Sequence, residues 1–273
     1  MIKNEEKPKV YVMLTFDVDG ETLWLSRDKV NPVGPVMRSQ GAYGPKVGMP
    51  RILNLLKRYG IKSTFFVPGW VAEHYEKTCE QILQEGHEIG HHGYLHEWPN
   101  RSTPDEERDS FKLGFEHLSR IMGCKPAGYR SPGWEFSDIT LDLLLENGFL
   151  YSSNMMDSDF PYEHKIDGRP TGLIELPVSW VLDDAAFFMF GITTSGYVIQ
   201  NARQVLEIWI DEFDGLYMEG NGRVFVLTMH PQIIGRHSRL LMLEKLVQHI
   251  CQKSDVSFST GKELAESYKR LKR

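Results

Sequence analysis

The sequence predicts an α/β protein in which residues 1–273 form one barrel domain of parallel strands surrounded by helices. Short apolar runs alternate about eight times with stretches of helical spacing, as in a parallel sheet. The first run, residues 10–16, is almost uniformly apolar, which is typical of a strand buried on both faces. At 273 residues the chain has the length of one barrel domain, so closure into a barrel is the economical arrangement.

Each later element is expected from a local pattern. Apolar runs predict further strands at residues 62–67, 87–90, 127–130, 150–152, 173–178, 224–229 and 256–259. Apolar residues at helical spacing predict helices at 51–59, 104–122, 140–147, 202–216, 238–253 and 262–271. Gly60 and Gly123 follow two of these helices and are expected to end them.

Two stretches break the alternation and are expected to be insertion loops. Residues 22–48 carry several Gly and Pro residues directly after the first strand, and long loops of this kind commonly form lids or walls of a site. Residues 181–200 carry the aromatic cluster Phe187, Phe188 and Phe190. This cluster fits a wall of the substrate pocket as well as it fits a subunit interface or the core of the loop.

Composition and charge exclude several classes of function. The net charge is −6 and the basic residues are scattered, so we expect no nucleic-acid partner. No apolar run approaches the roughly 18 residues of a membrane span. The charged N-terminus lacks the apolar stretch of a signal peptide, and the three Cys residues are not spaced as metal pairs. These features favour a cytoplasmic protein with reduced thiols.

A pair of carboxylates follows the first predicted strand. Asp17 and Asp19 alternate along an extended chain, so both side chains are expected to face the same point. Two like charges at such short range are stabilised by a bound cation or an arginine, and their pKa values then separate. Glu21 lies close enough in sequence to reach the same pocket as a substrate-binding residue.

A histidine-rich segment provides the remaining candidate ligands. His92 and His96 are four residues apart, and on a helical turn their rings would share one face. With Asp19 they would make a three-ligand metal site with positions open for water and substrate. His87 and His91 are not included among the ligands. His87 precedes the predicted strand, and His91 is expected to point away from its neighbour His92.

Four motifs in order resemble the polysaccharide deacetylase (NodB-homology, carbohydrate esterase) superfamily. They are the Asp17-x-Asp19 pair, the His92-x-x-x-His96 pair, Arg130-Ser-Pro-Gly-Trp134 and Leu227-Thr-Met-His230-Pro. The resemblance spans residues 10–260 and implies a distorted (β/α) barrel of the NodB type. The first motif departs from the common sugar-deacetylase form, in which the two aspartates are adjacent.

The resemblance also implies roles for the site residues. Asp19, His92 and His96 would hold one divalent metal ion, and water activated by this ion would attack an amide carbonyl. Asp17 would act as general base, His230 as general acid and Arg130 as the partner that orients Asp17. Two nitrogens and one oxygen suit Zn²⁺, Co²⁺, Mn²⁺ or Ni²⁺, of which zinc is favoured by affinity and availability.

Further segments resemble a branch that contains cyclic-imide hydrolases, cofactor-free allantoinases and a peptidoglycan-deacetylase-like protein. These are residues 41–45, 134–137, 176–184 and 230–236. Trp134 and Trp180 are candidates for the walls of a covered pocket, although Trp180 also fits a buried core position. Family resemblance and the apolar residues 185–190 predict a homo-oligomer, a dimer or tetramer.

Three functions follow from these observations. We favour ring-opening hydrolysis of a small cyclic imide, amide or ureide, because the chain carries no recognisable export signal. N-deacetylation of amino sugars or peptidoglycan is the alternative. A barrel that binds a ligand without catalysis is the third, and metal removal combined with an activity measurement would separate it from both enzymes.

Overall fold

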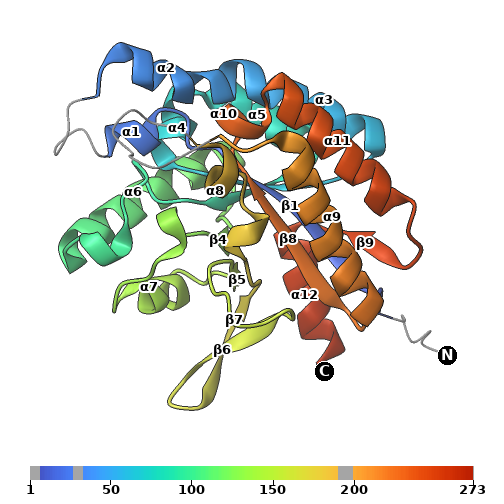
Figure 1. Ribbon diagram of the computed structural model, residues 1–273. Coiled ribbons are helices and arrows are strands. Elements are labelled where there is room, and N and C mark those ends of the chain that lie inside the picture. The colour runs from blue at the N-terminus through green and yellow to red at the C-terminus, as the bar shows by residue number, and fades with distance from the viewer. Residues whose placement is uncertain (1–6, 27–32, 190–198, 273) are drawn as a thin grey trace.

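One curled sheet forms the centre of the protein, with helices packed around it (Figure 1). The computed structural model describes residues 7–26, 33–189 and 199–272, and within them the sheet has nine strands. Eight of them follow the order β6-β7-β5-β4-β3-β2-β1-β8, and β9 also pairs with β1. The strands are β1 (Val10–Asp17), β2 (Thr64–Val67), β3 (Glu88–His91), β4 (Gly128–Tyr129), β5 (Tyr151–Ser152), β6 (Tyr162–Ile166), β7 (Arg169–Glu175), β8 (Arg223–Met229) and β9 (Val256–Phe258).

The sheet is parallel except for the antiparallel hairpin of β6 and β7. In the order of strands across the sheet, β6 stands at one end and β8 at the other. No pairing among the described residues joins these two strands. The α/β class of the distorted barrel is therefore confirmed, but the sheet is a curled, open one rather than a closed ring. Strand β6 was not predicted, because its residues are mostly half-buried or exposed and lack an apolar run.

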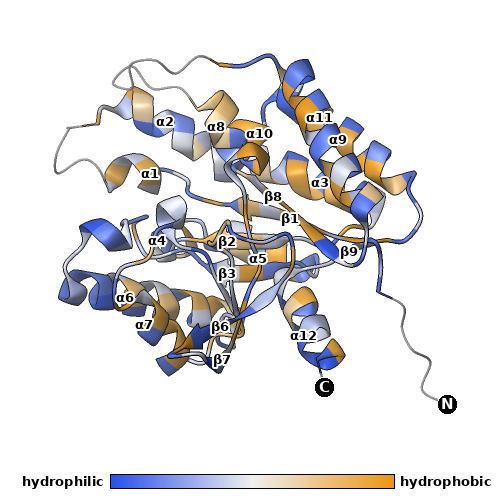
Figure 2. Cartoon of the chain, turned by 60° about the horizontal axis from the view of Figure 1, so that its bottom comes forward, coloured by the Kyte–Doolittle hydropathy of each residue, from blue (hydrophilic) through white to orange (hydrophobic). Residues whose placement is uncertain are grey.

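Strand β1 is the centre of the core and has neighbours on both sides. It pairs with β8 from Val10 to Phe16, while its other edge is shared between β9 at the start and β2 at the end. Phe16 is fully buried, and its ring stacks on Phe65 of β2 with centroids 4.9 Å apart. Figure 2 shows the strands at the centre largely in hydrophobic colour, whereas the surrounding helices carry both colours.

The six predicted helices lie at nearly the expected positions. They are α3 (Met49–Tyr59), α6 (Pro104–Met122), α7 (Thr140–Glu146), α9 (Ala202–Glu219), α11 (His237–Cys251) and α12 (Gly261–Leu271). Gly60 and Gly123 end α3 and α6 with φ of +65°, a conformation that glycine adopts without steric cost. Helices α4 (Gly69–His74) and α5 (Glu76–Gln84) are among those that were not predicted.

The first expected loop, residues 22–48, is largely helical in its described part, so that prediction was wrong. It contains α1 (Thr22–Leu25), α2 (Pro35–Tyr43) and a π-helical turn (Gly44–Gly48). Its glycines serve close packing rather than flexibility. A Cβ atom at Gly41 would overlap the backbone of Gly20, and one at Gly48 would overlap the backbone of Pro231. The segment thereby packs directly against the chain that follows β1 and β8.

The second expected loop is also partly helical. A 3₁₀ turn (Trp180–Leu182) leads into α8 (Asp184–Phe188), while residues 190–198, including Phe190, lie outside the described residues. Phe188 is buried in the main core and Phe187 packs against that core. Both rings are therefore used within this chain, and the homo-oligomer stays a prediction.

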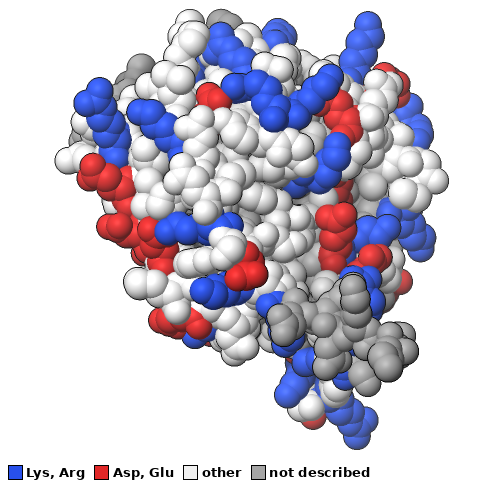
Figure 3. All heavy atoms as spheres, turned by 90° about the vertical axis from the view of Figure 1, so that its right-hand side faces the viewer, with Lys and Arg blue, Asp and Glu red and all other residues white. Residues whose placement is uncertain are grey.

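The described helices include none long and apolar enough to span a bilayer. Figure 3 shows Lys and Arg interspersed with Asp and Glu over one face of the molecule. A short helix, α10 (Pro231–Ile234), follows β8 directly and connects to α11. This connection lies beside the candidate site.

Candidate active site

The candidate residues gather at the edge of the sheet where the parallel strands end. Asp17 is the last residue of β1, and Asp19 follows two positions later. His92 comes directly after β3, Arg130 after β4 and His230 after β8. Because the carboxyl ends of neighbouring parallel strands meet at one edge, residues from distant parts of the chain converge there. All five side chains are buried.

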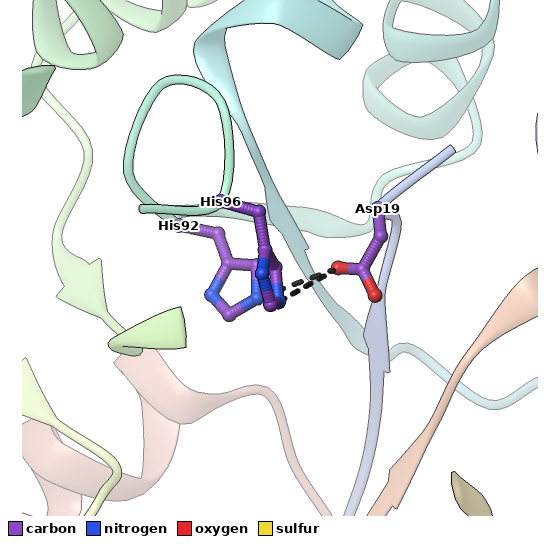
Figure 4. Close-up of side chains that lie close together, drawn as sticks. All are labelled: Asp19, His92 and His96. Carbon is purple, nitrogen blue, oxygen red and sulfur yellow. Dashed lines mark ion pairs between the residues drawn. The ribbon is translucent and has the colours of Figure 1, made fainter. Parts of the chain in front are cut away.

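Asp19, His92 and His96 form a compact cluster. Asp19 Oδ1 lies 3.4 Å from Nε2 of His92 and 3.8 Å from Nε2 of His96. Figure 4 shows the two imidazole rings side by side and facing the Asp19 carboxylate across a narrow gap. The three side chains are 0%, 1% and 5% exposed, so water screens their charges little.

The histidine pair does not lie on a helical turn, and that prediction was wrong. His92 and His96 follow β3 in an irregular turn, with Gly93 at φ +71° and His96 at φ +60°. These two left-handed residues reverse the chain so that both rings reach Asp19. The imidazole Nδ1 of His92 lies 2.7 Å from the carbonyl oxygen of Arg130, to which its N–H donates a hydrogen bond. This contact leaves Nε2 of His92 as the nitrogen with a free lone pair, aimed at the cluster.

The cluster fits a divalent cation. Among the described residues, Asp19 Oδ1 and His92 Nε2 are buried and have no hydrogen-bond partner. Burial alone would raise the pKa of Asp19, but the neighbouring histidines hold it well below its usual range. An ionised carboxylate with two imidazoles is a common ligand set for zinc and similar metals.

Asp17 is held in a fixed direction by Arg130. The guanidinium donates from Nη1 to Asp17 Oδ1 at 2.9 Å and to the Thr15 hydroxyl at 2.7 Å. Its Nη2 donates to the Ser153 hydroxyl at 2.9 Å. The second carboxylate oxygen of Asp17 lies 3.9 Å from Nε2 of His92. Arg130 therefore fixes one oxygen of Asp17 while the other faces the cluster.

His230 approaches from the opposite side. Its Nε2 lies 3.8 Å from Asp19 Oδ2, whereas its Nδ1 lies 2.6 Å from Asp184 Oδ1. Burial would lower the pKa of His230, but the carboxylates of Asp184 and Asp183 raise it well above the ordinary value. The two carboxylates therefore favour the protonated form of His230, whose Nε2 faces Asp19.

Two residues of the site were not predicted as functional. Asp184 supports His230, and Nε2 of Gln232 donates to Asp19 Oδ2 at 3.4 Å. Both residues stood within sequence segments noted for their family resemblance. The adjacent acidic residues 183 and 184 are the sequence feature that could have indicated the role of Asp184. Both carboxylates are buried, and a buried carboxylate requires a cationic partner.

The three expected substrate-binding residues lie at different places. Glu21 accepts a hydrogen bond from the Tyr75 hydroxyl at 2.7 Å and lines a surface hollow with Arg38 and Lys46. Trp134 is 7% exposed and its ring centroid lies 4.4 Å from that of Trp180. Trp180 is 52% exposed, so it is not a core residue.

Comparisons with known proteins agree with this fold. Residues 4–152 match the family model described as polysaccharide deacetylase. A peptidoglycan deacetylase of Helicobacter pylori is 35% identical, over 95% of this chain and 96% of its own length. The chain belongs to the polysaccharide deacetylase family.

Solved structures show the same similarity over nearly the whole chain. A protein of Mycobacterium smegmatis assigned to the polysaccharide deacetylases is 37% identical, with a TM-score of 0.90 over 98% of this chain and 93% of that one. The Puue allantoinase has a TM-score of 0.82 over 97% of this chain and 92% of that one, at 24% identity, which shows a shared fold. The family and fold expected from the four motifs are confirmed.

Proposed function

We propose that this protein is a divalent-metal-dependent amidohydrolase that removes acetyl groups from N-acetylated amino sugars of a glycan such as peptidoglycan. The observation that carries this proposal is the convergence of Asp19, His92 and His96 between Asp17 and His230. The glycan substrate is supported by the similarity of the whole chain to the H. pylori peptidoglycan deacetylase.

Asp19, His92 and His96 would hold the metal ion. When bound, a divalent ion lowers the pKa of its water from 15.7 to about 7 and polarises the substrate carbonyl. Zinc is the ion we favour, and Co²⁺, Mn²⁺ and Ni²⁺ also suit two nitrogens and one oxygen. The hydrogen bond from His92 to the Arg130 carbonyl fixes the ring in the orientation that a metal ligand requires.

Asp17 and His230 divide the proton transfers. Asp17, ionised beside Arg130, accepts a proton from the attacking water through the oxygen that faces the cluster. His230, charged beside Asp184, donates its Nε2 proton to the departing nitrogen. An amine leaves poorly without that proton, so an acid placed opposite the base suits amide hydrolysis.

Trp134 and Trp180 provide an aromatic surface for the substrate. Trp134 is fixed by burial, while about half of Trp180 is accessible to a ligand. A sugar ring presents apolar C–H groups that pack on such a surface. Glu21, bound to Tyr75, remains a candidate for substrate contact at the edge of the site.

The comparisons favour N-deacetylation over the ring-opening reaction that the sequence alone suggested. The similarity to a peptidoglycan deacetylase extends over both chains, whereas that to the allantoinase shows the fold alone. A non-catalytic barrel is disfavoured because the ligands, the acid and the base are all in place.

Acetate release tests the proposal. The purified, zinc-loaded protein is incubated with N-acetylglucosamine oligomers and with peptidoglycan, and in parallel with succinimide, hydantoin and dihydrouracil. We expect acetate from the glycans, loss of that activity on chelation and recovery with zinc. Ring opening without acetate would contradict deacetylation and support the imide reaction. Turnover that survives complete removal of the metal would contradict both.

A further inference from the structure

A hollow of about 270 Å³ lies beside the metal-ligand cluster. Its lining includes Trp24, Gln40, Phe188, Gln232, Arg236 and Arg239. Gln232 links this hollow to the site, because its Nε2 donates to Asp19 Oδ2 at 3.4 Å. A ligand in the hollow therefore extends from the reaction site towards the start of α11.

Among the described residues, Arg236 has no acidic neighbour in ion-pair contact, and the acidic neighbour of Arg239 is Asp184, which acts on its charge without forming an ion pair. The Arg236 guanidinium lies 3.5 Å from the centroid of the Tyr43 ring, and that of Arg239 lies 5.2 Å from the centroid of Phe188. Neither forms an ion pair with another described residue, and the described lining contains no carboxylate. The hollow thus has two guanidinium groups without a direct ion pair among the described residues, and the charge of Arg239 is offset in part by Asp184.

Two buried polar atoms at the hollow also lack partners. Gln232 is 6% exposed, and its Oε1 has no hydrogen-bond partner among the described residues. The same holds for Nε of Arg239, which is half-buried. Buried polar groups are normally hydrogen-bonded, since leaving them unpaired costs free energy. Gln232 Oε1 could accept a hydrogen bond from an N–H group of a ligand, and Arg239 Nε could donate one to an anionic oxygen of the same ligand.

The positive character continues away from the site. A second hollow, of about 440 Å³, shares Phe188, Ile199 and Arg239 with the first. Its described lining adds Arg203 and Lys245 and again contains no carboxylate. An anionic group on a bound ligand would be attracted to this region.

We propose that Gln232, Arg236 and Arg239 form a subsite for amide substrates that carry a carboxylate group. The guanidinium groups would bind the carboxylate, and Gln232 Oε1 would accept the N–H of the substrate amide. This inference rests on the proposed function and narrows its substrate class. Among N-acetylated amino sugars, those with a carboxylate substituent would be preferred over neutral ones.

Two sugars that differ by one substituent test the subsite. N-acetylmuramic acid carries a lactyl carboxylate that N-acetylglucosamine lacks, and both carry the same acetamido group. Their dissociation constants are measured by saturation-transfer NMR titration on the zinc-loaded protein. We expect N-acetylmuramic acid to bind about tenfold more tightly, because a charge-assisted hydrogen bond contributes that order of affinity. The preference should be lost in Arg239→Gln and in the Arg236→Gln/Arg239→Gln double variant.

Arg120→Gln is the matched control, since it removes the same charge from an exposed position on α6. It should keep the full preference. Equal binding of the two sugars, no detectable binding of either, or a preference that survives in the double variant would overturn the subsite. Acetate release from neutral N-acetylglucosamine oligomers is recorded separately. If the wild-type protein shows no preference but releases acetate, only the subsite is overturned. If the wild-type protein shows the preference but releases no acetate, only the proposed reaction is overturned.

Discussion

His230 and Asp184 form the closest contact between acid-base groups in the site, with Nδ1 2.6 Å from Oδ1. The same carboxylate accepts the backbone N–H of His230 at 3.0 to 3.1 Å. Asp184 thus fixes both the position of the ring and its charge. Because Nδ1 is engaged, only Nε2 is available to a substrate.

Asp184→Asn should shift the pH dependence of turnover. A general acid acts only while protonated, so activity falls as pH rises through the pKa of His230. The Asp184 charge raises this pKa, and its removal should start the decline at a lower pH. The pH profile of kcat checks this, with the exposed Asp142→Asn as control. An unchanged profile in a folded variant would exclude His230 as the titrating acid.

His96→Ala and Asp17→Asn should separate metal binding from proton transfer. His96→Ala removes one of three ligands, so the purified protein should contain little zinc by mass spectrometry. Asp17→Asn leaves the ligands intact and should keep zinc, while turnover falls by about 10²–10⁴-fold. If the Asp17→Asn protein contains no metal, Asp17 is the metal ligand and Asp19 the general base, the reverse of the roles proposed.

Zinc should stabilise the folded protein. Asp19 Oδ1 and His92 Nε2 are buried without hydrogen-bond partners among the described residues, and a bound ion would satisfy both. Free zinc at a thousand times its dissociation constant should add about 4 kcal/mol to the free energy of unfolding. Urea denaturation with and without chelator measures the difference. An equal midpoint in both conditions would argue against a metal at this cluster.

Glu175→Ala should weaken the support of Arg130. Glu175 Oε1 accepts the backbone N–H groups of Asn154 and Met155 at 2.6 and 2.9 Å, next to Ser153, which binds Arg130. The buried N–H of Asn154 and the half-buried N–H of Met155 would lose their acceptor, and the buried one alone should lower the free energy of unfolding by about 1–3 kcal/mol. Thermal denaturation checks this, and the exposed Glu212→Ala on α9 should change stability little. A Glu175→Ala protein as stable as the wild type would refute the proposed support.

The sequence alone determined the class of fold and the candidate ligands, base and acid of the site, but not Asp184 and Gln232. Alternating apolar runs and helical stretches are local patterns, and six helices and seven further strands followed from them. Asp17, Asp19, His92 and His96 could be named from their spacing along the chain. Arg130 could be named because its motif resembles that of the family.

Tertiary structure decided what local patterns do not encode. Asp184 reaches His230 because residue 183 bridges Thr228 of β8, a contact across 45 positions that no spacing reveals. The turn that joins His92 to His96 depends on two left-handed residues rather than on helical geometry. The β6–β7 hairpin stands at one end of the open sheet. Residues 35–48 are helical, and Gly41 and Gly48 allow them to pack against the backbone of Gly20 and Pro231. Each of these outcomes depends on contacts between segments far apart in the chain, and burial of such contacts overrides local preference.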